Sequence, residues 1–171
     1  MFEIHPTKAY KLTNSGLFTE NGKNSVVTNS SCNNGITGYT NLDNTEDGNI
    51  ITFSDTASHD AIFYQEKPFV GYSHVQGMYP KGEYKDSWGK HSYLFFLSLF
   101  KKTAYYMNFN YGNKFNRNIA KEISIKLPTI NDQIAFDFMQ DLMTALSKQV
   151  VHALNAYTSL KIQTAKEVIN K

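Results

Sequence analysis

The sequence predicts a mixed fold of the α/β (α+β) class, in which a twisted, β-rich domain with short helices occupies residues 1–128 and a long helix follows over 129–171. Short runs of β-branched residues alternate with polar turns through the first 60 residues, as is typical of small sheets. Pairs such as Asn34-Gly35 favour tight turns between strands. Residues 129–171 contain no glycine or proline, and their apolar positions recur at helical spacing. A chain of 171 residues is long enough for one domain with a buried core.

The strands are expected where β-branched and aromatic residues gather between turn signals. Residues 25–28 and 49–53 meet this description, and they are followed by further expected strands at 61–64, 68–72 and 123–127. The apolar run 93–100 has the length of a strand, but we favour a helix over 94–103. We also favour a short helix over 118–121.

The last 43 residues are expected to form a long helix that takes part in a coiled coil. Thr129 or Asn131 could cap its start. The helix is either continuous or interrupted between 155 and 159. Its apolar stripe is longer than one side of a small domain can cover, so we expect it to pair with a second helix, either from a partner or from another copy of the chain in a homodimer. The stripe comprises Ile134, Phe138, Leu142, Leu146, Val150, Leu154 and Tyr157.

The charge is distributed unevenly along the chain. Residues 1–89 carry six lysines and ten acids, whereas 90–171 carry eleven basic residues and five acids, although the whole chain has a formal charge of only +2. Cys32 is the single cysteine, which excludes an intrachain disulfide and fits a reducing compartment. No apolar run approaches the ~20 residues of a membrane span. We therefore expect a cytoplasmic protein that does not bind a membrane.

The basic part of the chain is equally consistent with binding to nucleic acid, such as double-stranded DNA, and with a solvated face whose aromatic residues turn into the core. Residues 101–117 interleave cations, aromatic residues and asparagines, and cations neutralise phosphates while Arg, Lys and Asn read base edges. The loop over 28–35 is rich in Asn and Ser, which suit bidentate base contacts and phosphate contacts. The candidate DNA-binding residues are Lys23, Asn29, Ser30, Asn33, Asn34, His74, Lys90, His91, Lys101, Lys102, Lys114 and Arg117.

Signals for catalysis are weak. The chain has no glycine-rich nucleotide motif, phosphate-binding loop or methyl-donor motif, and its histidines lack paired ligand spacing, so we expect no catalytic residue, cofactor or metal. One alternative is a small metal-dependent nuclease that uses Asp60, Glu83 and Lys85, because acids can hold the cation while a lysine lies near the attacking water. Another is a protein-interaction domain with no role on DNA.

Several segments, in order, resemble the target recognition domain of the specificity subunits of type I restriction-modification systems and of related type IIB enzymes. They are residues 22–30, 33–39, 48–52, 63–65 with 68–69, and then 111–116, 123–128 and 132–135, so that the resemblance covers about residues 1–148. It implies a non-catalytic α/β domain whose loops enter the DNA major groove.

The resemblance also implies partners. Complete specificity subunits hold two recognition units whose helices pair as an antiparallel coiled coil, and they direct separate methyltransferase and endonuclease subunits to the DNA. This chain has one unit and one helical tail, as expected of a half-subunit or of a piece of a longer one. We expect it to recognise one half-site.

Overall fold

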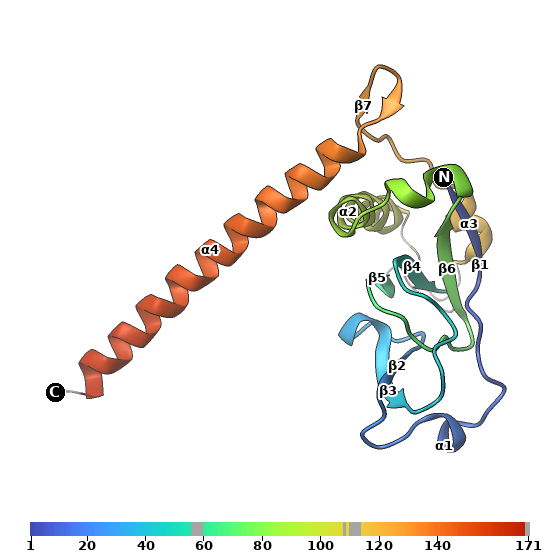
Figure 1. Cartoon of the computed structure of the whole chain (residues 1–171), viewed down its shortest axis with the longest axis horizontal. Coiled ribbons are helices and arrows are strands. Elements are labelled where there is room, and N and C mark those ends of the chain that lie inside the picture. The colour runs from blue at the N-terminus through green and yellow to red at the C-terminus, as the bar shows by residue number, and fades with distance from the viewer. Residues whose placement is uncertain (56–59, 108, 110–113, 170–171) are drawn as a thin grey trace.

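The computed structural model describes residues 1–55, 60–107, 109 and 114–169. A β-rich body is followed by a single long helix that projects away from it (Figure 1). The mixed α+β class predicted from the sequence is confirmed. No helix in the described ranges is both long enough and apolar enough to cross a membrane.

The body is built on a four-stranded antiparallel sheet. Its order is β1-β6-β4-β5, formed by β1 (Phe2–Pro6), β6 (Val75–Pro80), β4 (Ile50–Ser54) and β5 (Ile62–Gln65). Every residue of β4 is buried because this strand lies between two others and is covered on both faces. The strands expected at 49–53 and 61–64 are thus confirmed, each shifted by one residue.

A smaller two-stranded sheet lies beside the first. It pairs β2 (Asn24–Val27) with β3 (Ile36–Thr40), and the 3-10 turn η1 (Asn33–Gly35) precedes β3. The strand expected at 25–28 is confirmed. The short helix α1 (Asn14–Leu17) closes a minor core made of Leu17, Val26 and Val70.

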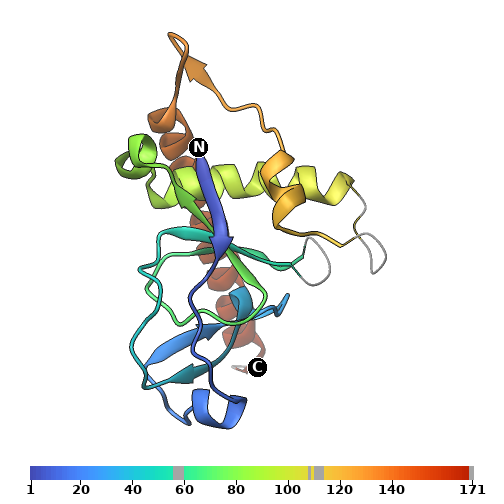
Figure 2. The same ribbon diagram turned by 90° about the vertical axis from the view of Figure 1, so that its right-hand side faces the viewer.

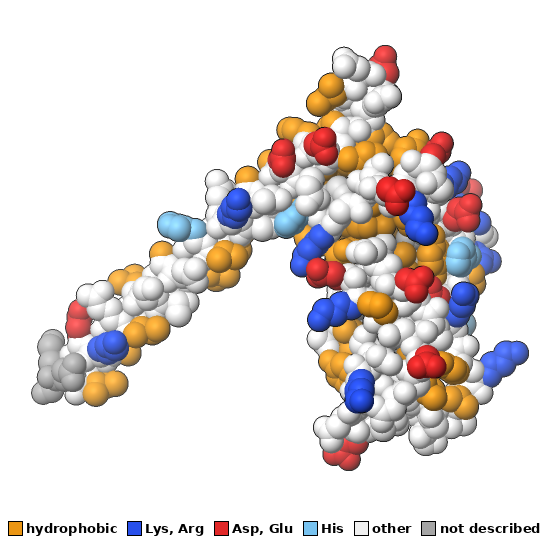
Figure 3. All heavy atoms as spheres, viewed as in Figure 1, with side chains coloured by type: hydrophobic (Ala, Val, Ile, Leu, Met, Phe, Trp, Pro, Cys, Tyr) orange, Lys and Arg blue, Asp and Glu red, His pale blue; other side chains and the backbone are white. Residues whose placement is uncertain are grey.

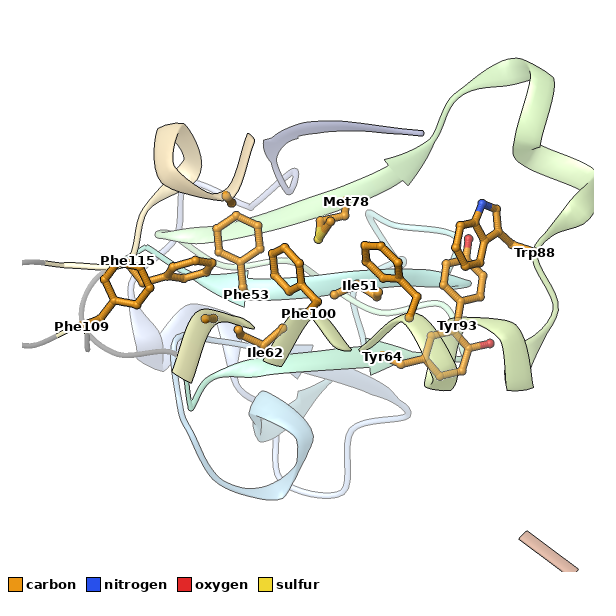
Figure 4. Packing of buried hydrophobic residues seen from close by; sticks show 13 residues of the cluster. Ile51, Phe53, Ile62, Tyr64, Met78, Trp88, Tyr93, Phe100, Phe109 and Phe115 are labelled. Atoms are coloured by element: carbon orange, nitrogen blue, oxygen red, sulfur yellow. The ribbon is translucent and has the colours of Figure 1, made fainter. Parts of the chain in front are cut away.

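Helix α2 (Lys90–Tyr106) covers one face of the large sheet and forms the main core with it. Its buried residues Tyr93, Phe96, Phe100 and Ala104 recur every three or four positions, which is the spacing of one helix face. Figure 4 shows the rings of Tyr93 and Phe100 packed against residues of the strands. The helix favoured over 94–103 is confirmed, and the strand alternative for 93–100 is wrong. The run is apolar all round because α2 lies between the sheet and a further helix.

Helix α3 (Arg117–Glu122) confirms the short helix expected over 118–121; it contacts β1 and adds Ala120 to the main core (Figures 1 and 2). A 3-10 segment, η2 (Gly82–Ser87), leads into α2.

Two expected strands are wrong. Residues 123–127 alternate in burial because Ile123, Ile125 and Leu127 pack on the main core, but they pair with no strand among the described residues. Residues 68–72 form only isolated bridges, such as Val26 with Val70.

The long helix α4 (Phe136–Ile169) begins later than expected. A hairpin of β7 (Thr129–Ile130) and β8 (Gln133–Ile134) precedes it, and its two turn residues Asn131 and Asp132 both have positive φ, as a type I′ turn requires. The predicted caps Thr129 and Asn131 are therefore wrong, and Ile134 belongs to β8 rather than to the helix. From Phe136 to Ile169 the helix is continuous, so the alternative of a break between 155 and 159 is wrong.

Candidate nucleic-acid interface

The asparagine-rich loop between β2 and β3 is wound tightly by its own hydrogen bonds. The Thr28 N–H donates to the carbonyl of Gly35 (2.8 Å), and Thr28 Oγ1 accepts from the Ser30 N–H (3.3 Å). Ser30 Oγ in turn accepts from the Cys32 N–H at 3.1 Å. These short-range contacts leave Asn29 and Asn33 exposed at the surface.

Asn34 anchors this loop to the edge of the large sheet. Its Nδ2 lies 3.1 Å from both the carbonyl of Tyr64 and Oε1 of Gln65. An amide nitrogen carries two hydrogens, so both of its donors are engaged within the protein. A bidentate contact with adenine needs one of these donors. Asn33 Nδ2 donates to the carbonyl of Ile36 (3.1 Å), which leaves its second hydrogen for such a contact.

The β5 strand connects the loop to the basic helix. Lys101 Nζ lies 5.4 Å from the centroid of the Phe63 ring, within the range of a cation–π contact. A Cβ added at Gly35 would lie 3.5 Å from the same ring. The segments η1 and α2, which are far apart in the sequence, therefore both contact β5 near Phe63. Figure 1 shows η1 in light blue next to β5 and below α2.

Neighbouring polar groups on this side are tied into the fold. Tyr64 Oη donates to Oδ1 of Asn49 at 2.7 Å. Burial raises the pKa of the Tyr64 phenol, and the charge of Glu66 raises it further, so the group remains a neutral donor. Lys90 Nζ forms an ion pair with Glu66 at 2.8 Å between two half-exposed side chains. Its charge is thus partly balanced before any DNA approaches.

His91 lies in the contact between α2 and α4. Its Nδ1 is 3.0 Å from Oγ1 of Thr144 and 3.2 Å from Nε2 of Gln140. The Oε1 of Gln140 also accepts from the N–H of Ser92 (3.2 Å). Half-buried and engaged with α4, His91 has a role in helix packing, which the sequence offered no means of seeing.

His74 and Lys23 stand in turns. His74 has a positive φ of 65° just before β6, and its Nδ1 is 3.4 Å from a carboxylate oxygen of Asp55. Gln76 Nε2 donates to the other oxygen of Asp55 at 2.7 Å. Lys23 is exposed in the turn before β2.

The remaining basic candidates surround the second half of α2. Lys102 is exposed and Lys101 half-buried on that helix, while Lys114 precedes Phe115, whose ring packs on Phe53 and Phe100 with centroids 5.0 and 6.1 Å apart. Arg117 opens α3, which contacts β1 at the opposite edge of the sheet from β5. The structure therefore does not bring the twelve candidates together on one surface. Residues 108 and 110–113 of the basic segment lie outside the described residues.

Sequence reasoning overlooked two side chains at this site, Phe63 and Gln65. Phe63 is half-exposed between the buried Ile62 and Tyr64, which is the alternation of a strand with one open face. That alternation was visible in the sequence, but the partners of the strand were not.

The residues of the nuclease alternative do not form a centre that could hold a metal. Glu83 and Lys85 are exposed on η2. Within the ranges that the structure covers, no three or more His, Cys, Asp or Glu side chains are grouped so that they could bind an ion.

Comparison with protein families identifies the chain. Residues 1–156 match the model of the type I restriction modification DNA specificity domain, a match that spans the whole body and the first part of α4. Searches of curated proteins and of solved structures found no match. Domains of this family are non-catalytic and recognise the target DNA sequence, and the family implies DNA and the modification and restriction subunits as partners. The resemblance found in the sequence is thus confirmed, and the chain belongs to the type I restriction-modification DNA specificity domain family.

Proposed function

We propose that this domain reads one half-site of its DNA target with the surface where η1, β5 and α2 meet, and that it directs separate methyltransferase and endonuclease subunits to that site. We call this surface the reading face and define it by its exposed and half-exposed side chains. They are Asn29, Ser30, Asn33, Phe63, Lys101 and Lys102.

The observation that carries the proposal is the junction at Phe63. Lys101 lies over its ring, and the same strand holds η1 through Asn34. A lysine suited to a phosphate thus stands beside amides suited to base edges, as readout in the major groove requires. The cation–π contact limits the freedom of the Lys101 side chain before DNA arrives, which lowers the entropy lost on binding.

The two kinds of contact have different signatures in a titration. Lys102→Ala should weaken binding to all duplexes alike and reduce the slope of log K against log salt by about 0.9. Asn33→Ala should instead relax one position of the target, at a cost of roughly 1–3 kcal/mol. Fluorescence anisotropy would measure both, with a duplex selected by the parent protein from a random library and with a shuffled duplex of the same composition.

Lys81→Ala serves as the matched control, because Lys81 is an exposed lysine ahead of η2, at the other end of α2 from Lys102. It should leave affinity and salt slope close to those of the parent. If Lys102→Ala and Asn33→Ala both bind the two duplexes like the parent, the reading face is misplaced.

We further propose that α4 pairs with a second helix, from another copy of this chain or from a second recognition unit. Large apolar side chains along it are exposed, among them Val150 at 58% and Tyr157 at 59% (Figure 3). Leu146, Val150, Ala153, Tyr157 and Leu160 are spaced by four, three, four and three residues, which is the repeat of a coiled-coil seam. Ile134 lies outside this seam.

A further inference from the structure

Gln65 is an almost fully buried polar side chain at the end of the edge strand β5. It is 4% exposed, and its whole amide is engaged. Nε2 donates to the carbonyl of Asn34 and to Oγ1 of Thr52, each at 3.0 Å, and Oε1 accepts from Nδ2 of Asn34 at 3.1 Å. A buried amide with all these groups paired specifies one local arrangement, because leaving any of them unpaired is costly.

The segment that Gln65 holds is a backbone of unusual conformation. Asn33, Asn34 and Gly35 have φ of 48°, 56° and 80°, so three successive residues lie in the left-handed region. Such a run persists only where its surroundings determine it. The Gln65 amide bonds both the backbone carbonyl and the side-chain amide of Asn34. Gln65 therefore holds η1 against the sheet from outside the loop.

Thr52 connects this support to the centre of the sheet. It is 1% exposed on β4, the strand between β6 and β5, and its hydroxyl accepts the second hydrogen of the Gln65 amide. The chain of contacts therefore runs from the rigid centre of the sheet through Gln65 to the exposed loop. Functional side chains on a loop need support of this kind to hold their position.

We propose that Gln65 is a positioning residue for sequence discrimination: it fixes η1, and with it Asn33, on the sheet without touching DNA. This inference rests on the proposed function of the reading face. Losing the support should weaken the contacts that depend on the position of the loop, whereas contacts between lysines and phosphates should persist, because they lie on α2.

The test compares two substitutions within the same hydrogen-bonded chain. Gln65→Met keeps the approximate shape of the side chain and removes both hydrogen bonds between its amide and Asn34, while the bond from Asn34 Nδ2 to the carbonyl of Tyr64 stays. Thr52→Val, the matched control, removes only the bond between Gln65 and Thr52 and leaves both contacts to Asn34 in place. The readout is the ratio of Kd for the shuffled duplex to Kd for the selected duplex, together with the salt slope and the hydrogen exchange of the Gly35 and Ile36 amides.

With Gln65→Met we expect the ratio to fall by about tenfold, the salt slope and the Kd for shuffled DNA to stay unchanged, and the loop amides to exchange faster. Thr52→Val should lower the melting temperature and keep the ratio. If Gln65→Met does not fold, Asn34→Gly replaces it, because glycine adopts the positive φ of this position and the change removes the bonds from Nδ2 to Oε1 of Gln65 and to the carbonyl of Tyr64.

The possible failures are distinguishable. A parent protein that does not discriminate between the duplexes overturns the proposed function and this inference with it. A discriminating parent whose ratio survives Gln65→Met overturns the role of Gln65 alone, as does a fall in ratio that Thr52→Val reproduces in full.

Discussion

Asparagines in this chain serve the backbone as much as the surface. Asn21, Asn33, Asn34, Asn49 and Asn131 all have positive φ, a conformation that asparagine tolerates better than most residues. The asparagine-rich composition between β1 and β4 is therefore in large part turn chemistry. Residue type alone cannot separate an asparagine that shapes a turn from one that reads a base, since both need an exposed loop.

The buried tyrosines make the stability of the domain sensitive to alkali. Burial raises the pKa of the Tyr93 phenol well above its ordinary value of 10.0, and Tyr64 adds to the effect; burial and Glu46 do the same for Tyr79. Above about pH 10 the unfolded chain loses these protons while the folded one keeps them, so the free energy of unfolding should fall as pH rises. Below pH 10 this contribution should be fully present.

Urea unfolding at pH 8 and pH 11 would measure this loss. Tyr93→Phe should reduce it, because one of the raised phenols is gone, while Tyr10→Phe, at a half-exposed phenol outside the main core, should not. An equal loss in Tyr93→Phe and in the parent would contradict the prediction.

The secondary-structure elements illustrate how neighbours override local pattern. The apolar run 93–100 of α2 has the length of a strand but the burial spacing of a helix. It is apolar on all sides because the helix is covered from two sides in the fold. Residues 123–127 show the reverse case: they alternate like a strand and pack Ile123, Ile125 and Leu127 on the main core, but they pair with no strand among the described residues. The period of apolar residues along the sequence therefore predicts which residues are buried. It is a weaker predictor of which strands pair by hydrogen bonds.

At the scale of one element, α3 should depend on its cap. Asn116 Oδ1 accepts from the N–H groups of Asn118 (2.9 Å) and Ile119 (3.2 Å), which have no partner inside the helix. Asn116→Ala should lower the free energy of unfolding by about 1 kcal/mol. Asn118→Ala, an exposed asparagine two residues on, should change it by less than about 0.5 kcal/mol. Equal effects of the two substitutions in denaturant titrations would refute the role of the cap.

On the scale of the whole molecule, the direction of α4 is set where the helix begins. Met139 is fully buried, Phe136 packs on Trp88 with ring centroids 5.0 Å apart, and Gln140 bonds with both His91 and Ser92. Beyond this contact the helix runs clear of the body (Figures 1 and 3). A rigid arm that carries an apolar seam can fix the distance between two recognition units, and hence between two half-sites.

Pairing through α4 should be abolished by charges in the seam. We expect the parent to sediment as a dimer at micromolar concentration and the double variant Leu146→Asp, Tyr157→Asp to sediment as a folded monomer, because burying carboxylates in a helix pair is costly. Asn155→Asp places the same charge on the opposite side of the helix and should remain dimeric. Analytical ultracentrifugation decides between these outcomes, and a parent that stays monomeric at every concentration would refute the pairing. The variant should retain binding to a single half-site.

Much of the fold was accessible from the sequence, and less of the site. The strands at β2, β4 and β5, the helices α2, α3 and α4 and the family could be predicted, because each depends on periodicity or on the order of short segments, whereas the short helix α1 was not predicted. The start of α4 could not, since Asn131-Asp132 is equally suited to a cap and to a hairpin turn. Which of the candidate residues contact DNA remains a prediction.

The sequence by itself determined the class of fold, the family, the absence of an intrachain disulfide and the apolar seam of the last helix, all of which are properties of composition and spacing. Only the tertiary structure decided that η1, Phe63 and Lys101 share one face and that Asn34 and His91 turn toward the protein. Asn34 meets Gln65 across 31 positions and His91 meets Thr144 across 53. A polar side chain takes whichever partner the fold brings within hydrogen-bonding distance, and no local pattern encodes that choice.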